Sequence, residues 1–301
     1  MAPRSEPFQH ITIRAWSGAV RAAWAGFAAL LVVAAVGVVG CASDARGVPG
    51  ATTPESAPSS EVREAASTSS AELSSVTVAP GRVEWFGDSL TASSVAELRA
   101  AFASAFGWGW SLEVSSFGGT ALCDWTAEIH DALRSQVRPA LIVLAFYGNN
   151  FTPCMGAVSP ERPTIEQGSP GFYDRYRSAI EQVARWSDQT GVPVIWVQAP
   201  PRAPEVAGGP VGVRDGLDAL AREQGWPVLE AGRALADRTG GFAAWLPCDR
   251  LDGSACIDGQ VKVRSDDLVH FEPAADPGEV SPGSRRWADE AFALIADTVG
   301  T

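Results

Sequence analysis

The sequence predicts an α/β domain in which helices cover both faces of a parallel β-sheet. Short apolar runs typical of strands alternate with longer helical stretches from about residue 80 to the end of the chain. One of these runs, "ALIVLAF" at residues 140–146, is apolar throughout, as expected for a strand buried on both faces. The length of residues 80–301 suits one domain with a sizeable core.

Five strands and five helices follow from this pattern. The strands are expected at residues 83–86, 112–116, 140–146, 194–198 and 228–230. The helices are expected at residues 94–106, 125–136, 173–189, 213–224 and 284–299. In such a sheet ligands bind beyond the carboxyl ends of the strands, so the residues that follow each strand are candidates for a functional site.

Residues 1–41 have the layout of a secretory signal, with a basic leader, an apolar segment and small residues at its end. Residues 22–42 carry no charge and are about long enough to cross a bilayer as a helix. The segment closes on "VVGC", which resembles the lipobox of bacterial lipoproteins, where the cysteine, here Cys41, is lipidated. The alternative is an uncleaved signal anchor with Cys41 incidental. Either way we expect the folded domain outside the cytoplasm, tethered to a bacterial membrane.

Residues 42–79 predict a disordered linker. They are rich in Ser, Ala, Thr, Pro and Glu and show no sustained apolar period. Such a segment buries too little apolar surface to offset the entropy lost on ordering. We expect a flexible spacer that holds the domain away from the membrane.

The charge of the chain excludes one class of partner. The formal net charge is −12, and without residues 1–40 it is −14. Because phosphate contacts dominate nucleic-acid affinity, we expect no binding of nucleic acid by this acidic domain. The sequence also has no phosphate-binding loop, dinucleotide fingerprint or cluster of metal ligands, so we expect no cofactor and no metal. We expect a monomer.

Four cysteines lie in the predicted domain, and an even number in an exported protein favours disulfides. Cys248 and Cys256 enclose the short polar loop "DRLDGSA" and are natural partners. Cys123 and Cys154 then pair by elimination. A zinc site is the rival interpretation, but the chain has no C-x-x-C and only three histidines.

Polar and small residues follow the ends of the first three predicted strands. The first strand runs into "GDSL", with Ser89 at its tip, and the second into "VSSFGGT", which contains Gly118. The third runs into "FYGNN", which ends in Asn150. Near the C-terminus "SDDLVHF" places Asp267 three residues before His270. The strand ends share one edge of the sheet, so we expect the residues that follow them to meet in one crevice.

These residue types fit a serine nucleophile activated by a base. A serine hydroxyl is a poor nucleophile until a neighbouring base removes its proton. His270 is the candidate base, because His10 lies in the signal segment and His130 lies within a predicted helix. Asp267 is the expected partner of the His270 imidazole, and the adjacent Asp266 is the alternative.

The same strand ends supply hydrogen-bond donors for an oxyanion. The backbone amides of Ser89 and Gly118, with the side-chain amide of Asn150, would face the oxyanion of a tetrahedral intermediate. Gly119 is the alternative to Gly118 as a backbone donor. The parts suffice for acyl transfer.

These blocks, in this order, resemble the SGNH/GDSL hydrolase family from about residue 83 onward. The resemblance implies that Ser89 is the nucleophile and that Asp267 and His270 form the D-x-x-H pair. It also implies that Gly118 and Asn150 belong to the oxyanion hole. It also implies a flavodoxin-like three-layer α/β/α sandwich on a five-stranded parallel sheet of order 2-1-3-4-5. Members of the family are mostly esterases, lipases and carbohydrate deacetylases.

Two phrases, "GGTALCDW" and "GNNFTPCM", are most similar to the SGNH domains of bacterial cell-surface acyltransferases. Two positions depart from the family pattern: Ser116 stands where the second block usually has Asn, and Phe151 stands where the third usually has Asp. The resemblance implies an exported serine hydrolase that cleaves or transfers an O-acyl group, for example acetyl, on a small-molecule or glycan ester. The alternative is a catalytically silent envelope-binding or structural lipoprotein that retains the fold.

Overall fold

The computed structural model describes residues 78–159, 163–203, 212–276 and 279–300. The expected signal segment with Cys41 lies outside the described residues, as does all of the expected linker except its last two residues. Within the described part of the chain, no helix combines the length and the apolar character needed to cross a membrane.

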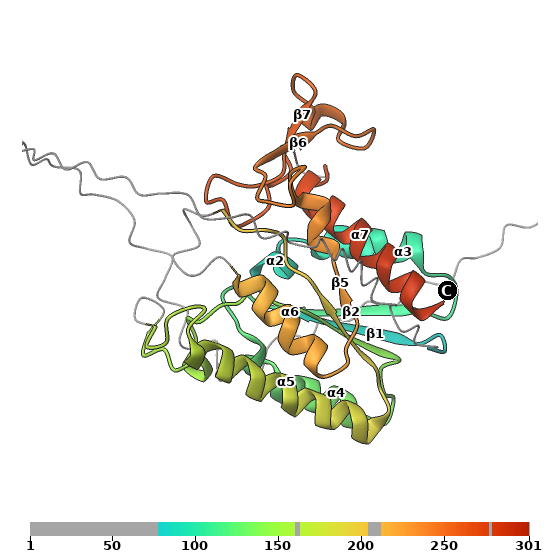
Figure 1. The fold of residues 1–301 in the computed structure, drawn as a ribbon. Coiled ribbons are helices and arrows are strands. Elements are labelled where there is room, and N and C mark those ends of the chain that lie inside the picture. Colours follow the sequence, from blue (N-terminus) through green and yellow to red (C-terminus); the bar gives the residue numbers. More distant parts are fainter. Residues whose placement is uncertain (1–77, 160–162, 204–211, 277–278, 301) are drawn as a thin grey trace, which may run out of the picture. The chain divides into compact units, whose positions relative to one another are not determined.

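Five parallel strands form the main sheet, in the order β2-β1-β3-β4-β5 (Figure 1). Their bounds are β1 Arg82–Gly87, β2 Ser111–Ser116, β3 Leu141–Ala145, β4 Val194–Val197 and β5 Val228–Leu229. Every strand boundary lies within one residue of the expected position. The α/β prediction and the flavodoxin-like strand order are therefore confirmed.

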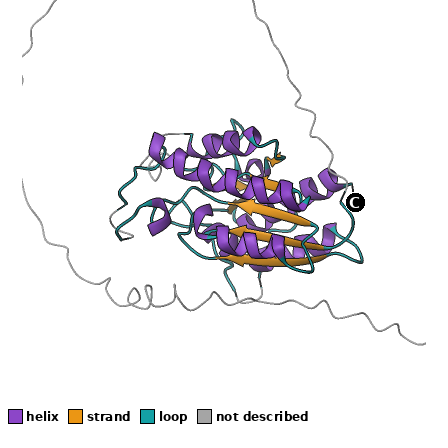
Figure 2. Cartoon of the chain, turned by 90° about the horizontal axis from the view of Figure 1, so that it is seen from below, coloured by secondary structure: helices purple, strands orange, loops and turns teal. Residues whose placement is uncertain are grey.

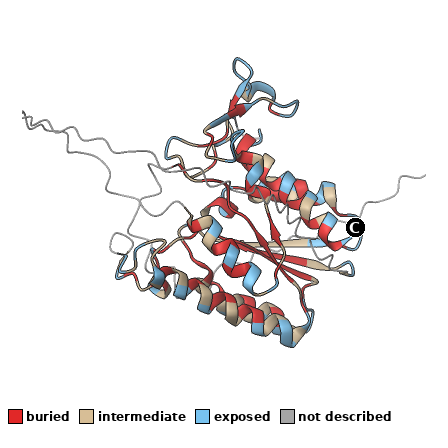
Figure 3. Cartoon of the chain, in the orientation of Figure 1, coloured by how far each residue is buried: buried red, intermediate tan, exposed pale blue. Residues whose placement is uncertain are grey.

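Helices cover both faces of this sheet, which gives three layers (Figure 2). One face carries α3 (Val95–Ala105) and α7 (Pro282–Val299), and the other carries α4 (Thr126–Arg134), α5 (Pro170–Thr190) and α6 (Val213–Glu223). Alternate strand residues serve the two faces: Val143 packs in the α3/α7 core and Leu144 in the α4/α5/α6 core. In Figure 3 the buried sides of the helices are turned toward the sheet.

Aromatic contacts join the first strand to the last helix. The Trp85 ring on β1 is fully buried. Its centroid lies 5.8 Å from that of Trp287 and 5.4 Å from that of Phe292, both on α7. Edge-on and tilted aromatic pairs at these separations stabilise a core beyond the area they bury. The two ends of the domain are therefore packed against each other.

The structure contains short elements that the sequence pattern does not predict. They are the helix α2 (Ser89–Ala92), the 3₁₀ helices η1 (Leu122–Asp124), η2 (Pro153–Met155), η3 (Ala231–Leu235) and η4 (Gly253–Ala255), and an antiparallel pair of strands, β6 (Trp245–Pro247) and β7 (Gln260–Lys262). Helix α5 also begins three residues before the expected position. Ser169 caps it by accepting from the Phe172 N–H, and Pro170 occupies the first turn.

Candidate active site

Ser89 lies directly after β1, at the carboxyl edge of the sheet and at the start of α2. Asp88 caps this short helix by accepting a hydrogen bond from the Leu90 N–H at 3.1 Å. At Gly87 any β-carbon would collide with the Thr91 side chain and lie 2.8 Å from the Ala145 carbonyl oxygen, so only glycine fits. The turn leaves Ser89 partly exposed, as a nucleophile must be.

The Asp88 carboxylate ties the Ser89 turn to the end of β3. One of its oxygens accepts from the Tyr147 N–H at 2.6 Å and from the Asn149 side-chain amide at 3.2 Å. Burial raises the pKa of Asp88 to about 6, against the opposing effects of these backbone hydrogen bonds and of the charges on Arg202 and His270. His270 is therefore within electrostatic range of the residue that precedes Ser89.

Asp267 holds His270 in one orientation. Asp267 Oδ2 lies 2.6 Å from His270 Nδ1, and Asp267 Oδ1 accepts from the N–H groups of Val269 and His270. Burial alone would raise the pKa of Asp267, but hydrogen bonds from His270, Ser265 and the backbone hold it well below its usual range. Asp266, the alternative partner, is instead paired with Lys262.

The loop around this pair has a strained backbone. Leu268, between Asp267 and His270, has φ of +60°, in the left-handed region that a branched side chain rarely adopts. With Nδ1 facing Asp267, the Nε2 atom of His270 is available to a hydroxyl. No hydrogen bond joins Ser89 to His270 among the described residues.

Gly118, and not Gly119, lies beside Ser89. A β-carbon built on Gly118 would be 3.8 Å from the β-carbon of Ser89. Gly119 has no such neighbour within 4 Å, and its φ of +78° makes it the turn residue of this loop. The geometry therefore favours Gly118 as the backbone donor.

The two asparagines after β3 have hydrogen-bond partners that the sequence does not predict. Asn150 is buried, and its amide donates to the Ile165 carbonyl at 2.7 Å. Asn149 instead donates to Asp88 and, at 3.0 Å, to the Thr120 carbonyl. The structure therefore places Asn149, and not Asn150, next to the Ser89 turn.

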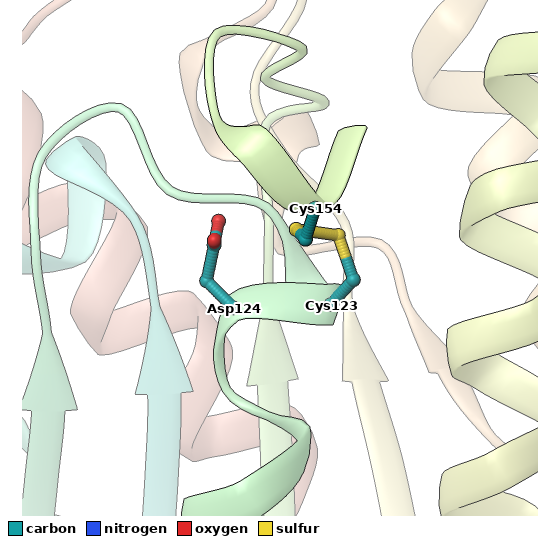
Figure 4. Close-up of side chains that lie close together, drawn as sticks. All are labelled: Cys123, Asp124 and Cys154. Carbon is teal, nitrogen blue, oxygen red and sulfur yellow. A yellow bond between two sulfur atoms is a disulfide. The ribbon is translucent and has the colours of Figure 1, made fainter. Parts of the chain in front are cut away.

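Both predicted disulfides are present. Cys123–Cys154 joins η1 to η2, and Cys248–Cys256 closes the loop between β6 and β7. Figure 4 shows Asp124 next to the first disulfide, and the three side chains have metal-ligating atoms within 4.8 Å of one another. Because both sulfurs are consumed in the disulfide, they offer no thiolates, and the group does not fit a metal.

Two arginines of the site were not predicted. Arg264 is fully buried and donates to the Val269 carbonyl at 2.9 Å and to the Pro201 carbonyl at 3.2 Å, and burial lowers its pKa to about 10. Arg202, in the loop after β4, donates to the Tyr147 carbonyl. The only sequence signal was the position of Arg202 soon after a predicted strand.

A family model described as "Protein of unknown function (DUF459)" matches residues 82–277. The chain belongs to this family. The DUF459 match includes all five strands of the main sheet and extends from β1 past His270. None of the curated protein sequences matches the chain.

Solved structures similar to this DUF459 protein include an α/β hydrolase from the metagenome of Lake Arreo, Spain (TM-score 0.47, 13% identity, 74% of this chain and 98% of that chain). Another is the C-terminal catalytic domain of peptidoglycan O-acetyltransferase A from Streptococcus pneumoniae (TM-score 0.44, 13% identity, 74% and 96%). A third is an acetyl xylan esterase from Geobacillus stearothermophilus (TM-score 0.45, 10% identity, 74% and 96%).

Proposed function

We propose that this protein is an exported serine esterase or O-acyltransferase of the SGNH type. The observation that carries the proposal is the Asp267–His270 pair, whose carboxylate fixes the imidazole through Nδ1 and leaves Nε2 for a hydroxyl. An aspartate that orients a histidine in this way suits a general base for a serine hydroxyl.

In the proposed reaction His270 Nε2 takes the proton of the Ser89 hydroxyl while its oxygen bonds to the ester carbonyl carbon. The N–H groups of Ser89 and Gly118 donate to the resulting oxyanion, and the Asn149 amide does so in place of one of the two bonds it makes to Asp88 and Thr120 in the free protein. The carbon–oxygen bond to the alcohol then breaks, and the alcohol leaves with the proton held by His270. Water or a second alcohol attacks the acyl-Ser89 intermediate by the same steps in reverse.

Asp267 remains a carboxylate throughout. Its lowered pKa keeps it ionised, so it stabilises the imidazolium that forms in each step without itself taking the proton. The finer assignments, namely export, a lipid on Cys41 and an acyl ester of a cell-envelope glycan as substrate, belong to the same proposal. Export and lipidation are supported by the signal-like residues 1–41, and a cell-envelope substrate by the resemblance of "GGTALCDW" and "GNNFTPCM" to the domains of cell-surface acyltransferases.

The test is hydrolysis of 4-nitrophenyl acetate and labelling by a fluorophosphonate. The wild-type protein should react with both, and Ser89→Ala should lose labelling and at least about 10³-fold in turnover. Ser93→Ala is the matched control, because Ser93 is an exposed serine one helical turn away. Wild-type turnover by Ser89→Ala would remove Ser89 from the mechanism.

A catalytically silent envelope protein is the second candidate. It is favoured by one observation, that Ser89 and His270 form no hydrogen bond in the described part of the structure. Catalytic hydrogen bonds in free enzymes are often long and shorten only when substrate binds. The missing bond therefore does not distinguish a silent protein from an enzyme, and their reactivity must be compared instead. A folded wild-type protein that neither takes the label nor hydrolyses the ester would establish the silent protein.

A further inference from the structure

Arg202 occupies the same edge of the sheet as the proposed nucleophile. It lies in the loop after β4, just as Ser89 follows β1 and Gly148 follows β3. A short chain of contacts joins it to the site: the Arg202 guanidinium donates to the carbonyl of Tyr147, and the N–H of Tyr147 donates to Asp88. Asp88 is the residue before Ser89.

The charge of Arg202 is not neutralised by any described carboxylate. Its guanidinium has five N–H donors, and Tyr147 is the only described residue that accepts from it. The Nε atom is buried without an acceptor. The Asp88 charge acts on Arg202 at longer range, but the Asp88 oxygens already accept three N–H groups.

Two other arginines of the domain are neutralised by carboxylates. Arg285 and Arg286 each pair with both Asp249 and Asp252, at distances between 2.6 and 3.4 Å. In a chain with a formal net charge of −12, acidic partners are abundant. A half-buried guanidinium to which the described residues offer no carboxylate, at the ligand-binding edge of the sheet, is suited to donate to an anion from outside the protein.

The guanidinium is also held in place before any ligand arrives. It stacks on the Tyr147 ring with 4.0 Å between Cζ and the ring centroid. A fixed fork of donors loses little entropy when it binds a carboxylate or phosphate.

We propose that Arg202 binds a carboxylate or phosphate group carried by the ester substrate, so that the site prefers anionic O-acyl esters to neutral ones. This rests on the proposed function, because Ser89 must be the nucleophile for Arg202 to act as a specificity residue. The anion can belong to the acyl part or to the alcohol part, and the test separates the two.

The experiment measures kcat/KM for two matched pairs of esters. The first pair is 4-nitrophenyl hemisuccinate and its methyl ester, which differ only by a charge on the acyl part. The second pair is 4-acetoxybenzoate and its methyl ester, which differ only by a charge on the alcohol part. In one pair, we expect the charged ester to be preferred about tenfold or more, with the preference falling as salt is added.

Arg202→Gln should abolish that preference, and Arg202→Lys should retain part of it, because lysine keeps the charge but not the fork. Arg177→Gln is the matched control. It removes the same charge from α5, where Arg177 forms an exposed ion pair with Glu223 of α6, and the preference of this variant should equal that of the wild type. Only the ratio within a pair is compared, so a change in overall activity does not affect the result.

The outcomes separate the two proposals. Hydrolysis of the neutral esters by the wild type with no preference in either pair overturns the role of Arg202 and leaves the esterase proposal standing. A preference that survives in Arg202→Gln likewise overturns it. If the folded wild type hydrolyses none of the four esters, the proposed function fails and the role of Arg202 fails with it.

Discussion

Two aspartates of the candidate site have opposite protonation behaviour because their surroundings differ. Asp88 is buried, and burial raises its pKa to about 6 although three N–H groups donate to it. Asp267 is half exposed, and hydrogen bonds from His270 and Ser265 outweigh the effect of burial and lower its pKa. Asp88 is therefore suited to shape the Ser89 turn, and Asp267 is suited to remain charged beside an imidazole.

The lowered pKa of Asp267 predicts a pH-dependent contribution to stability. A carboxyl with a folded-state pKa below the ordinary 3.8 stabilises the fold fully above that value and loses its contribution as the pH falls through the folded pKa. The difference in Tm between wild type and Asp267→Asn should therefore be largest near pH 7 and shrink below about pH 4. Thermal unfolding from pH 3 to 7 measures it.

Asp266→Asn is the control for this measurement, because Asp266 is exposed and pairs only with Lys262 among the described residues. A Tm difference for Asp267→Asn that is constant from pH 3 to 7 would contradict the assignment. Asp88 should act in the opposite sense, since its raised pKa makes its ionisation destabilising as the pH rises from 3.8 to about 6.

A second prediction distinguishes the roles of the two asparagines after β3. Asn149→Ala should lower kcat by about 10²-fold or more with little change in KM, as expected when an oxyanion donor is lost. Asn150→Ala should mainly lower stability, by about 1–3 kcal/mol, because it leaves the partly buried Ile165 carbonyl without its donor. Steady-state kinetics measured beside Tm will distinguish them. A selective loss of kcat in Asn150→Ala alone would restore the assignment made from the sequence.

The sequence locates Ser89, Asp267 and His270 because each belongs to a short motif whose geometry is local. Asp267, for example, bonds atoms no more than three residues away. The sequence alone cannot choose between Asn149 and Asn150, because the choice depends on distant residues. Asn150 bonds to Ile165, 15 residues away, and Asn149 bonds to Thr120, 29 residues away. The roles of Arg202 and Arg264 likewise depend on contacts between loops distant in the chain.

At the scale of elements, prediction from sequence succeeded wherever burial on a face gave a periodic or continuous apolar run. Strand β3 has every residue buried, and its position follows from composition alone. Strands β6 and β7 have three residues each, too few for an alternating pattern to be recognised, and they are joined by a loop closed by Cys248–Cys256. Their pairing depends on that covalent link and on tertiary contacts.

The disulfide between η1 and η2 should matter more than the one between β6 and β7. In the chain-entropy estimate a sequence separation of 31 contributes about 3–4 kcal/mol, and a separation of 8 contributes about 2–3 kcal/mol. The double variant Cys123→Ser, Cys154→Ser should therefore unfold at the lower temperature. It should also lose activity, since the bridge joins the loops that carry Gly118 and Asn149.

The Cys248→Ser, Cys256→Ser double variant is the matched control. The two double variants are compared by thermal unfolding and by ester hydrolysis. Peptide mapping of the wild type under non-reducing conditions verifies the pairing. Free thiols at Cys123 and Cys154 in the purified protein would refute the bridge. An equal fall in Tm for both double variants would refute the ranking.

At the scale of the whole molecule, the proposed tether is tested by the mass of the mature protein. Expressed in a bacterium that processes lipoproteins, the chain should lose residues 1–40 and gain a lipid on Cys41. Cys41→Ala should then keep its leader. Recovery of the wild type with its leader intact would establish the signal anchor instead.

The contact of Trp85 with Trp287 sets the order in which the domain can be completed during synthesis. Strand β1 is an inner strand of the sheet and is made first of the five, and α7, which covers Trp85, is made last. At 5–20 residues per second, the ribosome needs about 10–40 s to add the intervening roughly 200 residues. During that interval the apolar strand is open on its α7 face, a surface that other chains or chaperones can bind. Truncations that remove α7 should therefore aggregate, even though every residue proposed for catalysis is still present.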